Sequence, residues 1–308
     1  MPGKFNVVGI GEVLWDLLPG GPQMGGAPAN FAYHAHALGA KSQVITRVGK
    51  DELGRKILRR FRELGLPRAA VQEDDAAPTG TARVTLSGDG VAGFTIQENV
   101  AWEFLAATPE AESAVRAADV VCVGSLAQRS AIVRESIQQL VAAAPPHALR
   151  IFDVNLRQRY YSREIIEESL RLASALKLNE DELQVLAVMF GMGGSVRDKM
   201  EQLARRLEGG RVARQSRIVA LTRGASGSLL YCDGCWSDAT SRPIKVVDTV
   251  GAGDAFTAAL ALGLLHKAEI DSVNSLANEV ARFVCTQAGA TPALPATLAE
   301  RLRKTTSS

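Results

Sequence analysis

The stretch from Asp248 to Phe256, DTVGAGDAF, combines two carboxylates with two glycines directly before an apolar, helix-forming run. Gly251, Ala252 and Gly253 have little or no side chain, so their backbone N–H groups can approach a ligand closely. N–H groups at the start of a helix are unpaired and carry a partial positive charge, which favours anions. The stretch therefore predicts an anion hole suited to a phosphoryl group in transfer.

Asp254 lies in the first turn of that predicted helix, where its carboxylate can reach the same space. A carboxylate beside an anion hole is best explained as a base that removes a proton from an attacking hydroxyl. In the alternative interpretation, Asp254 only caps the helix and the glycines only form a turn. We interpret Asp254 as the candidate catalytic base.

A second glycine pair, Gly25-Gly26, lies near the N-terminus and precedes Asn30 and a predicted helix. Asp16 follows the first predicted strand by a few residues. Asp and Asn side chains beside bare glycine backbone supply the donors and acceptors that sugar hydroxyls require. Turns use the same residue types, so this pattern alone leaves both a sugar site and a simple turn open.

Polar side chains also follow two strands predicted in the middle of the chain. The strand in FDVNLR ends with Asp153, Asn155 and Arg157. The strand in KLNEDEL passes into a helix near Asn179 and Glu182. Oxygen atoms at strand ends can hold a hydrated Mg²⁺, although Asn179 could instead cap the helix that follows.

The elements that must position these residues alternate between strands and helices. Apolar runs such as FNVVGI, QVITRVG, DVVCVGS and RIVALT are separated by segments with helical spacing of apolar residues. This alternation predicts an α/β fold with a mostly parallel central sheet and helices on both faces. Ligands of such sheets bind beyond the carboxyl ends of the strands, where Thr222 and Gly224 of TRGASGS also lie.

The segment from Thr81 to Phe104 departs from this alternation. Two strands of alternating character flank SGDG, which is a hairpin signal, and no long helix separates them. We predict a small antiparallel β insertion, on the scale of a lid, within a single domain of residues 1–308.

Composition and motifs exclude several other classes of protein. The formal net charge is +2 and no basic block stands out, so nothing favours binding to nucleic acid or membrane surfaces. No run approaches the roughly 18 apolar residues of a membrane span, and the N-terminal apolar run is too short for a signal peptide. We therefore expect a cytoplasmic protein. The chain has no GxxxxGK[ST] motif and lacks the third glycine of a dinucleotide fingerprint, which disfavours P-loop enzymes and NAD-linked oxidoreductases.

Cys232 and Cys235 in YCDGCW have the spacing of a redox or metal site. A zinc site would need two further ligands nearby, and the sequence has no second CxxC and no HxxxH. The Asp233-Gly234 pair between the cysteines is a tight hairpin signal, so we interpret both as structural thiols.

Five blocks of the sequence occur in a recognisable order: GGAPAN, FDVNLR, KLNEDEL, TRGASG and DTVGAGD. In order and spacing they resemble the ribokinase-like (PfkB) carbohydrate kinase family over about residues 5–296. The resemblance implies a ribokinase-like α/β fold. It also implies ATP with Mg²⁺ as the phosphoryl donor and a small-molecule sugar as the acceptor.

The resemblance further implies a role for each candidate residue. The base would be Asp254, and the anion hole would comprise Gly251, Ala252 and Gly253. The sugar would be bound by Asp16, Gly25, Gly26, Asn30 and Arg157. ATP and Mg²⁺ would be bound by Asn179, Glu182, Thr222, Gly224 and Asn278, with Asn278 near the adenine.

Two features of the resemblance extend beyond the catalytic centre. Asp248 would belong to a loop for a monovalent cation such as K⁺, which the GATPALP segment would complete. The insertion at 81–104 would be a lid that excludes water. In related kinases this lid often pairs two subunits, which implies a homodimer.

The form GGAPAN, rather than the GGKGAN-like form of ribokinases, is similar to fructokinases. The D-x-N-x-R of FDVNLR is similar to both fructokinases and 2-keto-3-deoxygluconate kinases, and its Arg157 could hold an acid substrate or order the phosphates. The valine in FDVNLR and the missing Leu-Trp after it depart from the usual fructokinase pattern. The alternatives are a 2-keto-3-deoxygluconate or nucleoside kinase of the same fold, or a non-catalytic sugar-sensing protein.

Overall fold

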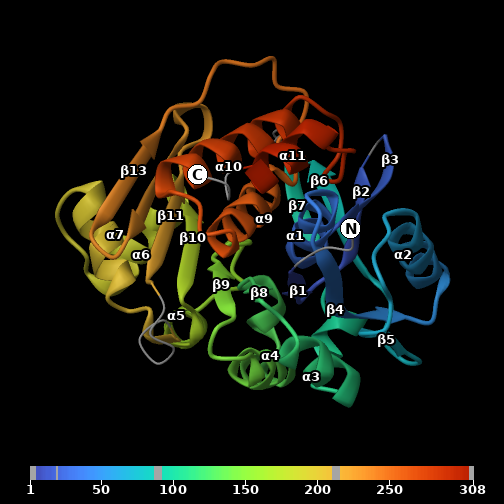
Figure 1. Cartoon of the computed structure of the whole chain (residues 1–308). Helices are drawn as coiled ribbons and strands as arrows, with labels where there is room; N and C mark the ends of the chain where they lie inside the picture. The colour runs from blue at the N-terminus through green and yellow to red at the C-terminus, as the bar shows by residue number, and fades with distance from the viewer. Residues whose placement is uncertain (1–4, 19, 87–91, 210–215, 305–308) are drawn as a thin grey trace.

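The computed structural model describes residues 5–18, 20–86, 92–209 and 216–304, which form two β-sheets surrounded by helices (Figure 1). The strands of the large sheet are β1 (Asn6–Ile10), β4 (Lys41–Gly49), β5 (Val71–Asp74), β8 (Val120–Val123), β9 (Leu149–Asp153), β10 (Ala175–Asn179), β11 (Ile218–Thr222), β12 (Ser228–Cys232) and β13 (Cys235–Ala239). Their order across the sheet is β13-β12-β11-β10-β9-β8-β1-β4-β5.

Every neighbouring pair from β5 to β11 is parallel, and only the pairs that involve β12 are antiparallel. The predicted mostly parallel α/β sheet is therefore confirmed. The central strands read as continuous apolar runs because both of their faces are covered. In β1, for example, Val8 and Ile10 pack into one hydrophobic core and Val7 packs into the core on the opposite face.

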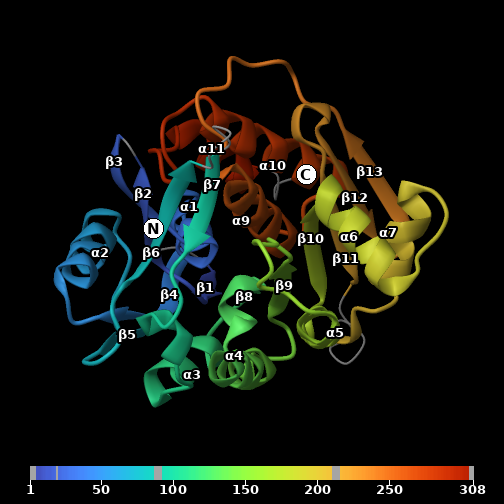
Figure 2. The same ribbon diagram turned by 180° about the vertical axis from the view of Figure 1, so that it is seen from behind.

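Helices cover both faces of the large sheet (Figures 1 and 2). One face is covered by α3 (Pro109–Arg116), α4 (Ala131–Ala143), α5 (Arg163–Leu172), α6 (Glu180–Phe190) and α7 (Val196–Ala204). The other is covered by α1 (Ala27–Ala37), α9 (Ala252–Leu265), α10 (Ile270–Cys285) and α11 (Ala296–Lys304). The central helix of the second face, α9, is apolar on all sides because it packs on the sheet, α1 and α10 at once.

The helix α2 (Glu52–Glu63) lies beside β4 and closes a third, smaller core. Ile57 and Phe61 are four residues apart, so they share one helix face and are both fully buried. The Asp51 side chain caps the helix by accepting a hydrogen bond from the Gly54 N–H at 2.7 Å. The predicted helical spacing of this segment is therefore confirmed.

The small sheet has the strand order β3-β2-β6-β7 and consists of β2 (Leu14–Leu18), β3 (Gly21–Gly25), β6 (Gly80–Leu86) and β7 (Ala92–Ile96). Strands β6 and β7 form the antiparallel hairpin that the sequence predicts, although the SGDG turn lies outside the described residues. Strands β2 and β3 were not predicted, and in β3 the sequence GPQMG contains two glycines and a proline, which are poor strand formers.

The insertion also ends earlier than its predicted boundary at residue 104. Residues 101–104 form a 3₁₀ turn, and the Trp102 side chain is fully buried in the core of the large sheet. The helices α3 and α11 and the short strand β5 are further elements that the sequence analysis did not predict. No helix within the described ranges is long and apolar enough to span a membrane.

The YCDGCW segment forms the β12–β13 hairpin, in which Cys232 pairs directly with Cys235. Asp233 and Gly234 adopt positive φ angles of 44° and 95°, as a tight hairpin turn of this kind requires. Both thiols are free, and the described residues contain no group of three or more His, Cys, Asp or Glu side chains placed to hold a metal ion. The hairpin prediction is confirmed.

Candidate active site

The carboxyl ends of the parallel strands open into a cavity of about 990 Å³, bounded also by the start of α9 and the small sheet. This volume is at the upper end of the range for small-molecule sites, so the cavity has room for more than a single sugar. Most of the candidate residues line it, namely Asp16, Gly25, Gly26, Asn30, Asn155, Arg157, Asn179, Glu182, Thr222, Gly224, Gly251, Ala252, Gly253, Asp254 and Asn278. The exceptions are Asp153 and Asp248.

The glycine-rich loop reaches the cavity at the start of α9. Gly251 is the N-terminal cap residue, with φ at 79°, and a Cβ added there would lie 2.4 Å from the Ala290 carbonyl oxygen. Only glycine fits both the backbone conformation and the space. No side chain caps α9, so donors in its first turn are left for a ligand.

Asp254 follows this loop, in the first turn of α9. Its Oδ2 accepts a hydrogen bond from Asn30 Nδ2 at 2.8 Å, which connects α9 to the start of α1. Desolvation, followed by the negative charge of Asp153, raises the pKa of Asp254 to about 6, while Asn30, Lys177 and Arg157 lower it. The carboxyl group is therefore ionised at neutral pH and is basic enough to accept a proton.

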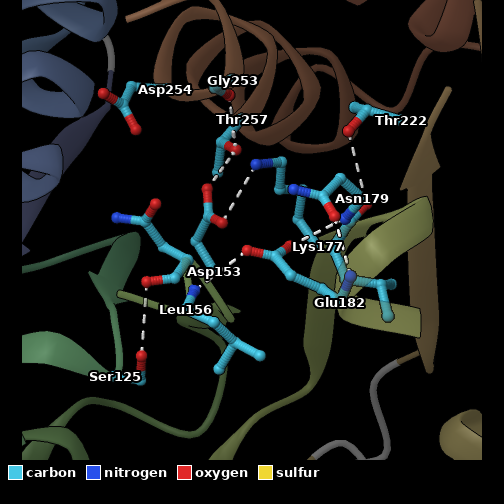
Figure 3. A network of polar contacts seen from close by, with 12 residues as sticks. Ser125, Asp153, Leu156, Lys177, Asn179, Glu182, Thr222, Gly253, Asp254 and Thr257 are labelled. Atoms are coloured by element: carbon cyan, nitrogen blue, oxygen red, sulfur yellow. Dashed lines mark hydrogen bonds and ion pairs between the residues drawn. The ribbon is translucent and has the colours of Figure 1, made fainter. Parts of the chain in front are cut away.

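A buried ion pair lies beneath the loop (Figure 3). Lys177 Nζ lies 3.1 Å from Asp153 Oδ1, and Thr257 Oγ1 donates to Asp153 Oδ2 at 2.9 Å. Lys177 and Asp153 are direct neighbours across β10 and β9, and both side chains point to the α9 side of the sheet. A Cβ on Gly253 would lie 2.9 Å from Lys177 Nζ, so the ammonium group lies directly against the anion-hole loop.

This ion pair changes the interpretation of two residues. Asp153 was expected to offer its oxygens to Mg²⁺, but both are engaged with Lys177 and Thr257 and the residue does not line the cavity. The sequence analysis did not identify Lys177 as a site residue, although it lines the cavity. In the sequence, Lys177 is a single lysine inside the otherwise apolar strand SALKLN. A buried ammonium group requires a counter-charge, so a lysine at such a position indicates a buried ion pair.

Asn179 and Glu182 form a capping box at the start of α6 (Figure 3). Asn179 Oδ1 accepts from the Glu182 N–H at 2.8 Å, and Glu182 Oε2 accepts from the Asn179 N–H at 2.8 Å. Glu182 Oε1 also accepts from the Leu156 N–H at 3.0 Å. The helix-capping interpretation of Asn179 is confirmed, and the role of both residues in binding Mg²⁺ remains a prediction.

The glycine pair at the start of α1 makes room for the Asp16 side chain and for the backbone at Glu12. A Cβ on Gly25 would lie 2.3 Å from Asp16 Oδ2, and a Cβ on Gly26 would lie 2.5 Å from the Glu12 carbonyl oxygen. Desolvation raises the pKa of Asp16 to about 6, and the charge of Arg157 opposes this shift. Glu12 also lines the cavity but was not predicted as a site residue. The one indication in the sequence was its position shortly after the first strand.

Three residues lie toward the other end of the cavity, beyond β10. Thr222 ends β11 and donates from Oγ1 to the Leu178 carbonyl oxygen at 3.4 Å, and Gly224 follows with a positive φ of 53°. Asn278 on α10 donates from Nδ2 to Ser228 Oγ at 2.5 Å and to the Asn274 carbonyl oxygen at 2.9 Å. These bonds fix the Asn278 side chain at the wall of the cavity.

Asp248 lies behind the cavity wall, where it supports the loop. Its Oδ1 accepts from the Val250 N–H and its Oδ2 from the Gly289 N–H, both at 3.0 Å. It thereby connects the DTVGAGD loop to the GATPALP segment. Its part in a monovalent-cation site remains a prediction.

In the described residues, a mostly parallel large sheet, a small second sheet and a glycine-flanked aspartate at a helix start are arranged as in sugar kinases of the ribokinase-like class. The chain belongs to the pfkB family of carbohydrate kinases, whose family model matches residues 21–297. The family resemblance seen in the sequence is therefore confirmed.

Relatives of known activity or with a bound ligand support the same family. A fructokinase of Klebsiella pneumoniae is 31% identical, over 96% of this chain and 97% of the relative. The structure of a sugar kinase of Pyrococcus horikoshii in complex with ATP is similar with a TM-score of 0.81 and 27% identity, over 97% and 99% of the two chains. A fructokinase of Vibrio cholerae with bound fructose, ADP and calcium ion has a TM-score of 0.77 and 26% identity, over 96% and 98%.

Proposed function

We propose that this protein is an ATP-dependent sugar kinase that transfers the γ-phosphoryl group of ATP to a hydroxyl group of fructose. The observation that carries the proposal is the position of Asp254, in the same cavity as the sugar-site candidates and next to the uncapped, glycine-rich start of α9. The V. cholerae relative with fructose and ADP and the K. pneumoniae relative support fructose as the substrate.

In the proposed reaction, Asp254 removes the proton from the attacking sugar hydroxyl. The hydroxyl oxygen forms a bond to the γ-phosphorus in line, the bond from that phosphorus to the β–γ bridging oxygen breaks, and ADP leaves. Backbone N–H groups of Gly251, Ala252 and Gly253 stabilise the charge on the phosphoryl oxygens. Asn30 holds the base through the 2.8 Å hydrogen bond to Asp254.

A neutral sugar fits the charges of the cavity better than a sugar acid. Glu12, Asp16 and Asp254 contribute three carboxyl groups to the sugar end of the cavity. The nearby cations are Arg157, whose side chain is exposed, and Lys177, which is already paired with Asp153. A carboxylate on the substrate would be repelled by whichever of the three carboxyl groups are ionised. Hydroxyl groups, by contrast, can donate to carboxylates or accept from carboxylic acids.

ATP would occupy the remainder of the cavity, with Asn179, Glu182, Thr222, Gly224 and Asn278 around it. The donors present fit Mg²⁺ carried by the nucleotide, because Mg²⁺ keeps several waters and commonly binds one or two carboxylates together with substrate phosphates. Glu182 lines the cavity and would contribute a carboxylate oxygen in addition to accepting from the Leu156 and Asn179 N–H groups, and the described residues offer no cage of three acidic or metal-binding side chains. The bound ion would neutralise charge on the phosphates.

Three further proposals accompany this function. Asp248 and the GATPALP segment, joined by the bond from the Gly289 N–H, would form the site of a monovalent cation such as K⁺. The small sheet would act as the lid and, in the manner implied by the family, would pair two subunits. The protein would act in the cytoplasm.

The test is ADP release across a panel of fructose, 2-keto-3-deoxygluconate and nucleosides, with Mg²⁺ and K⁺ present. Asp254→Asn should reduce kcat on fructose by at least about 10²-fold, while calorimetry shows nearly unchanged ATP binding. Asp198→Asn is the matched control, because Asp198 is also an acid in a first helical turn but lies on α7, outside the cavity. It should leave kcat unchanged.

Each alternative outcome changes a defined part of the proposal. Activity on another substrate, lost in Asp254→Asn, would retain the mechanism and replace fructose. Near-normal turnover in Asp254→Asn would remove the assigned base. Sugar binding without ADP release on any substrate would indicate a sugar-sensing protein instead.

A further inference from the structure

Glu12 lies directly after β1 and lines the cavity, yet only 2% of its surface is exposed. Its Oε2 atom is buried and has no hydrogen-bond partner among the described residues. The side chain is near the start of α1, a helix with no side-chain cap and no acidic residue in its first turn. An ionised carboxylate oxygen buried without a partner is costly, so this position requires a physical explanation.

Asn30, in the first turn of α1, also has a buried side-chain oxygen without a hydrogen-bond donor among the described residues. Its Nδ2 donates to Asp254, while its Oδ1 is buried and has no partner within the described part of the chain. Chemistry fixes this orientation, because an ionised carboxylate only accepts hydrogen bonds and the amide nitrogen must therefore face Asp254. The Oδ1 atom is left as an acceptor in need of a donor.

A proton on Glu12 would satisfy both atoms. Among the two side chains, only the carboxyl group can gain an O–H, which turns an unpaired acceptor into a donor. Burial raises the pKa of Glu12 to about 7 and the charge of Asp254 acts in the same direction, against the backbone N–H groups of Glu12 and Ala27 and the charge of Arg157. A protonated carboxyl group at this position is thus accessible near neutral pH.

We propose that Glu12 is a positioning residue for the catalytic base: its protonated carboxyl group donates to Asn30 Oδ1 and thereby keeps Asn30 Nδ2 on Asp254. The inference rests on the proposed function of Asp254 as the base. Glu12 acts through Asn30 and touches no reacting atom. When Glu12 loses its proton, two acceptors face each other and the orientation of Asn30 is no longer enforced.

The titratable groups that face Glu12 come from several elements. Asp254 on α9 favours the protonated form, whereas Arg157 after β9 favours the ionised form. Asp16 on β2 lines the same cavity, and Cys122 on β8 is a buried thiol whose raised pKa keeps it neutral. Glu12 and Asp254 therefore titrate as an interacting pair, in which Asp254 ionises first because its pKa is lower.

The first test is the pH dependence of kcat for wild type, Glu12→Gln and Glu12→Leu. Wild type should show a bell-shaped profile, with an acid limb from Asp254 and an alkaline limb from Glu12. The glutamine side chain can donate to Asn30 Oδ1 at every pH, so Glu12→Gln should retain activity and lose the alkaline limb. Glu12→Leu offers no donor and should lower kcat about tenfold at every pH, with the KM for ATP unchanged.

Asp51→Asn is the control, because it also alters a carboxylate that serves a helix start, but on α2, away from the cavity. Both limbs should persist in it. An alkaline limb that survives in Glu12→Gln, or a kcat of Glu12→Leu equal to that of wild type, would overturn the inference alone. A fully active Asp254→Asn would instead overturn the proposed base, so the two failures are distinguishable.

A second measurement needs no turnover and decides the matter if Glu12→Leu does not fold. Carbon-13 NMR of labelled glutamate should show Glu12 titrating near pH 7. Asn30→Leu removes the acceptor of its proton, which should lower this pKa by about one unit because the neutral form loses its hydrogen bond. Titration at an ordinary glutamate pKa in wild type, or no change in Asn30→Leu, would refute the hydrogen bond.

Discussion

Burial and a few neighbouring groups set the basicity of Asp254. Desolvation and then the negative charge of Asp153 raise its pKa, while the amide of Asn30 and the ammonium of Lys177 lower it. The sequence revealed Asp254 and Asn30, because glycine-rich motifs surround them. It did not reveal Lys177 or Glu12 as site residues, because a residue's contact with a cavity depends on how distant strands align.

Gly251 allows a prediction at this scale. Gly251→Ala places a side chain at φ 79°, 2.4 Å from the Ala290 carbonyl oxygen, which is rigid backbone. We expect a loss of unfolding free energy of roughly 2 kcal/mol from strain alone, and a kcat lowered by at least about 10²-fold as the anion hole shifts. Urea denaturation and ADP release measure the two effects.

Gly253→Ala is the matched comparison. Its added Cβ would meet only the flexible end of Lys177, at 2.9 Å, so its loss of stability should be clearly smaller. If both variants are as stable as wild type, the backbone at residue 251 does not require glycine.

At the scale of elements, apolar runs predicted the parallel strands, because a strand that is buried on both faces needs apolar residues at nearly every position. Strand β3 could not be predicted, since GPQMG has no alternation and gains its order by pairing with β2. Trp102 likewise depends on tertiary packing, which places its side chain in the main core although it falls within the predicted insertion.

The ion pair between neighbouring strands β9 and β10 gives a prediction at this scale. Lys177→Met leaves Asp153 as a buried charge that keeps the hydrogen bond from Thr257 but has lost its counter-charge, so the free energy of unfolding should fall by about 3–5 kcal/mol. The double variant Lys177→Met/Asp153→Asn removes both charges and should recover much of this loss. Denaturant titration of the single and double variants measures the coupling energy between Lys177 and Asp153. Losses of unfolding free energy that simply add in the double variant would contradict this coupling.

At the scale of the whole molecule, burial of the Glu12 carboxyl group in the cavity makes the free energy of unfolding depend on pH. The folded-state pKa of Glu12, about 7, lies above its unfolded value of 4.5, so the folded protein binds more protons between these values. Its contribution to stability is present at low pH and is lost as pH rises toward and through 7. His34, buried with a pKa lowered to about 4, acts in the opposite direction over this range.

The Glu12→Gln variant separates these effects, because His34 is common to both proteins. The unfolding free energy of the variant minus that of wild type should increase by about 2 kcal/mol between pH 5.5 and 7.5. Urea titrations at several pH values provide the measurement. A difference independent of pH would mean that Glu12 has an ordinary pKa in the folded protein.

The hydrogen bond between Asn30 and Asp254 joins residues 224 positions apart. Contacts of such long sequence separation form late, since chain entropy must be overcome before they contribute. During synthesis, the first strands and α1 emerge long before α9 exists to meet them. The complete catalytic centre therefore forms only once nearly the entire chain has folded, and partially folded intermediates have no means of phosphorylating a sugar.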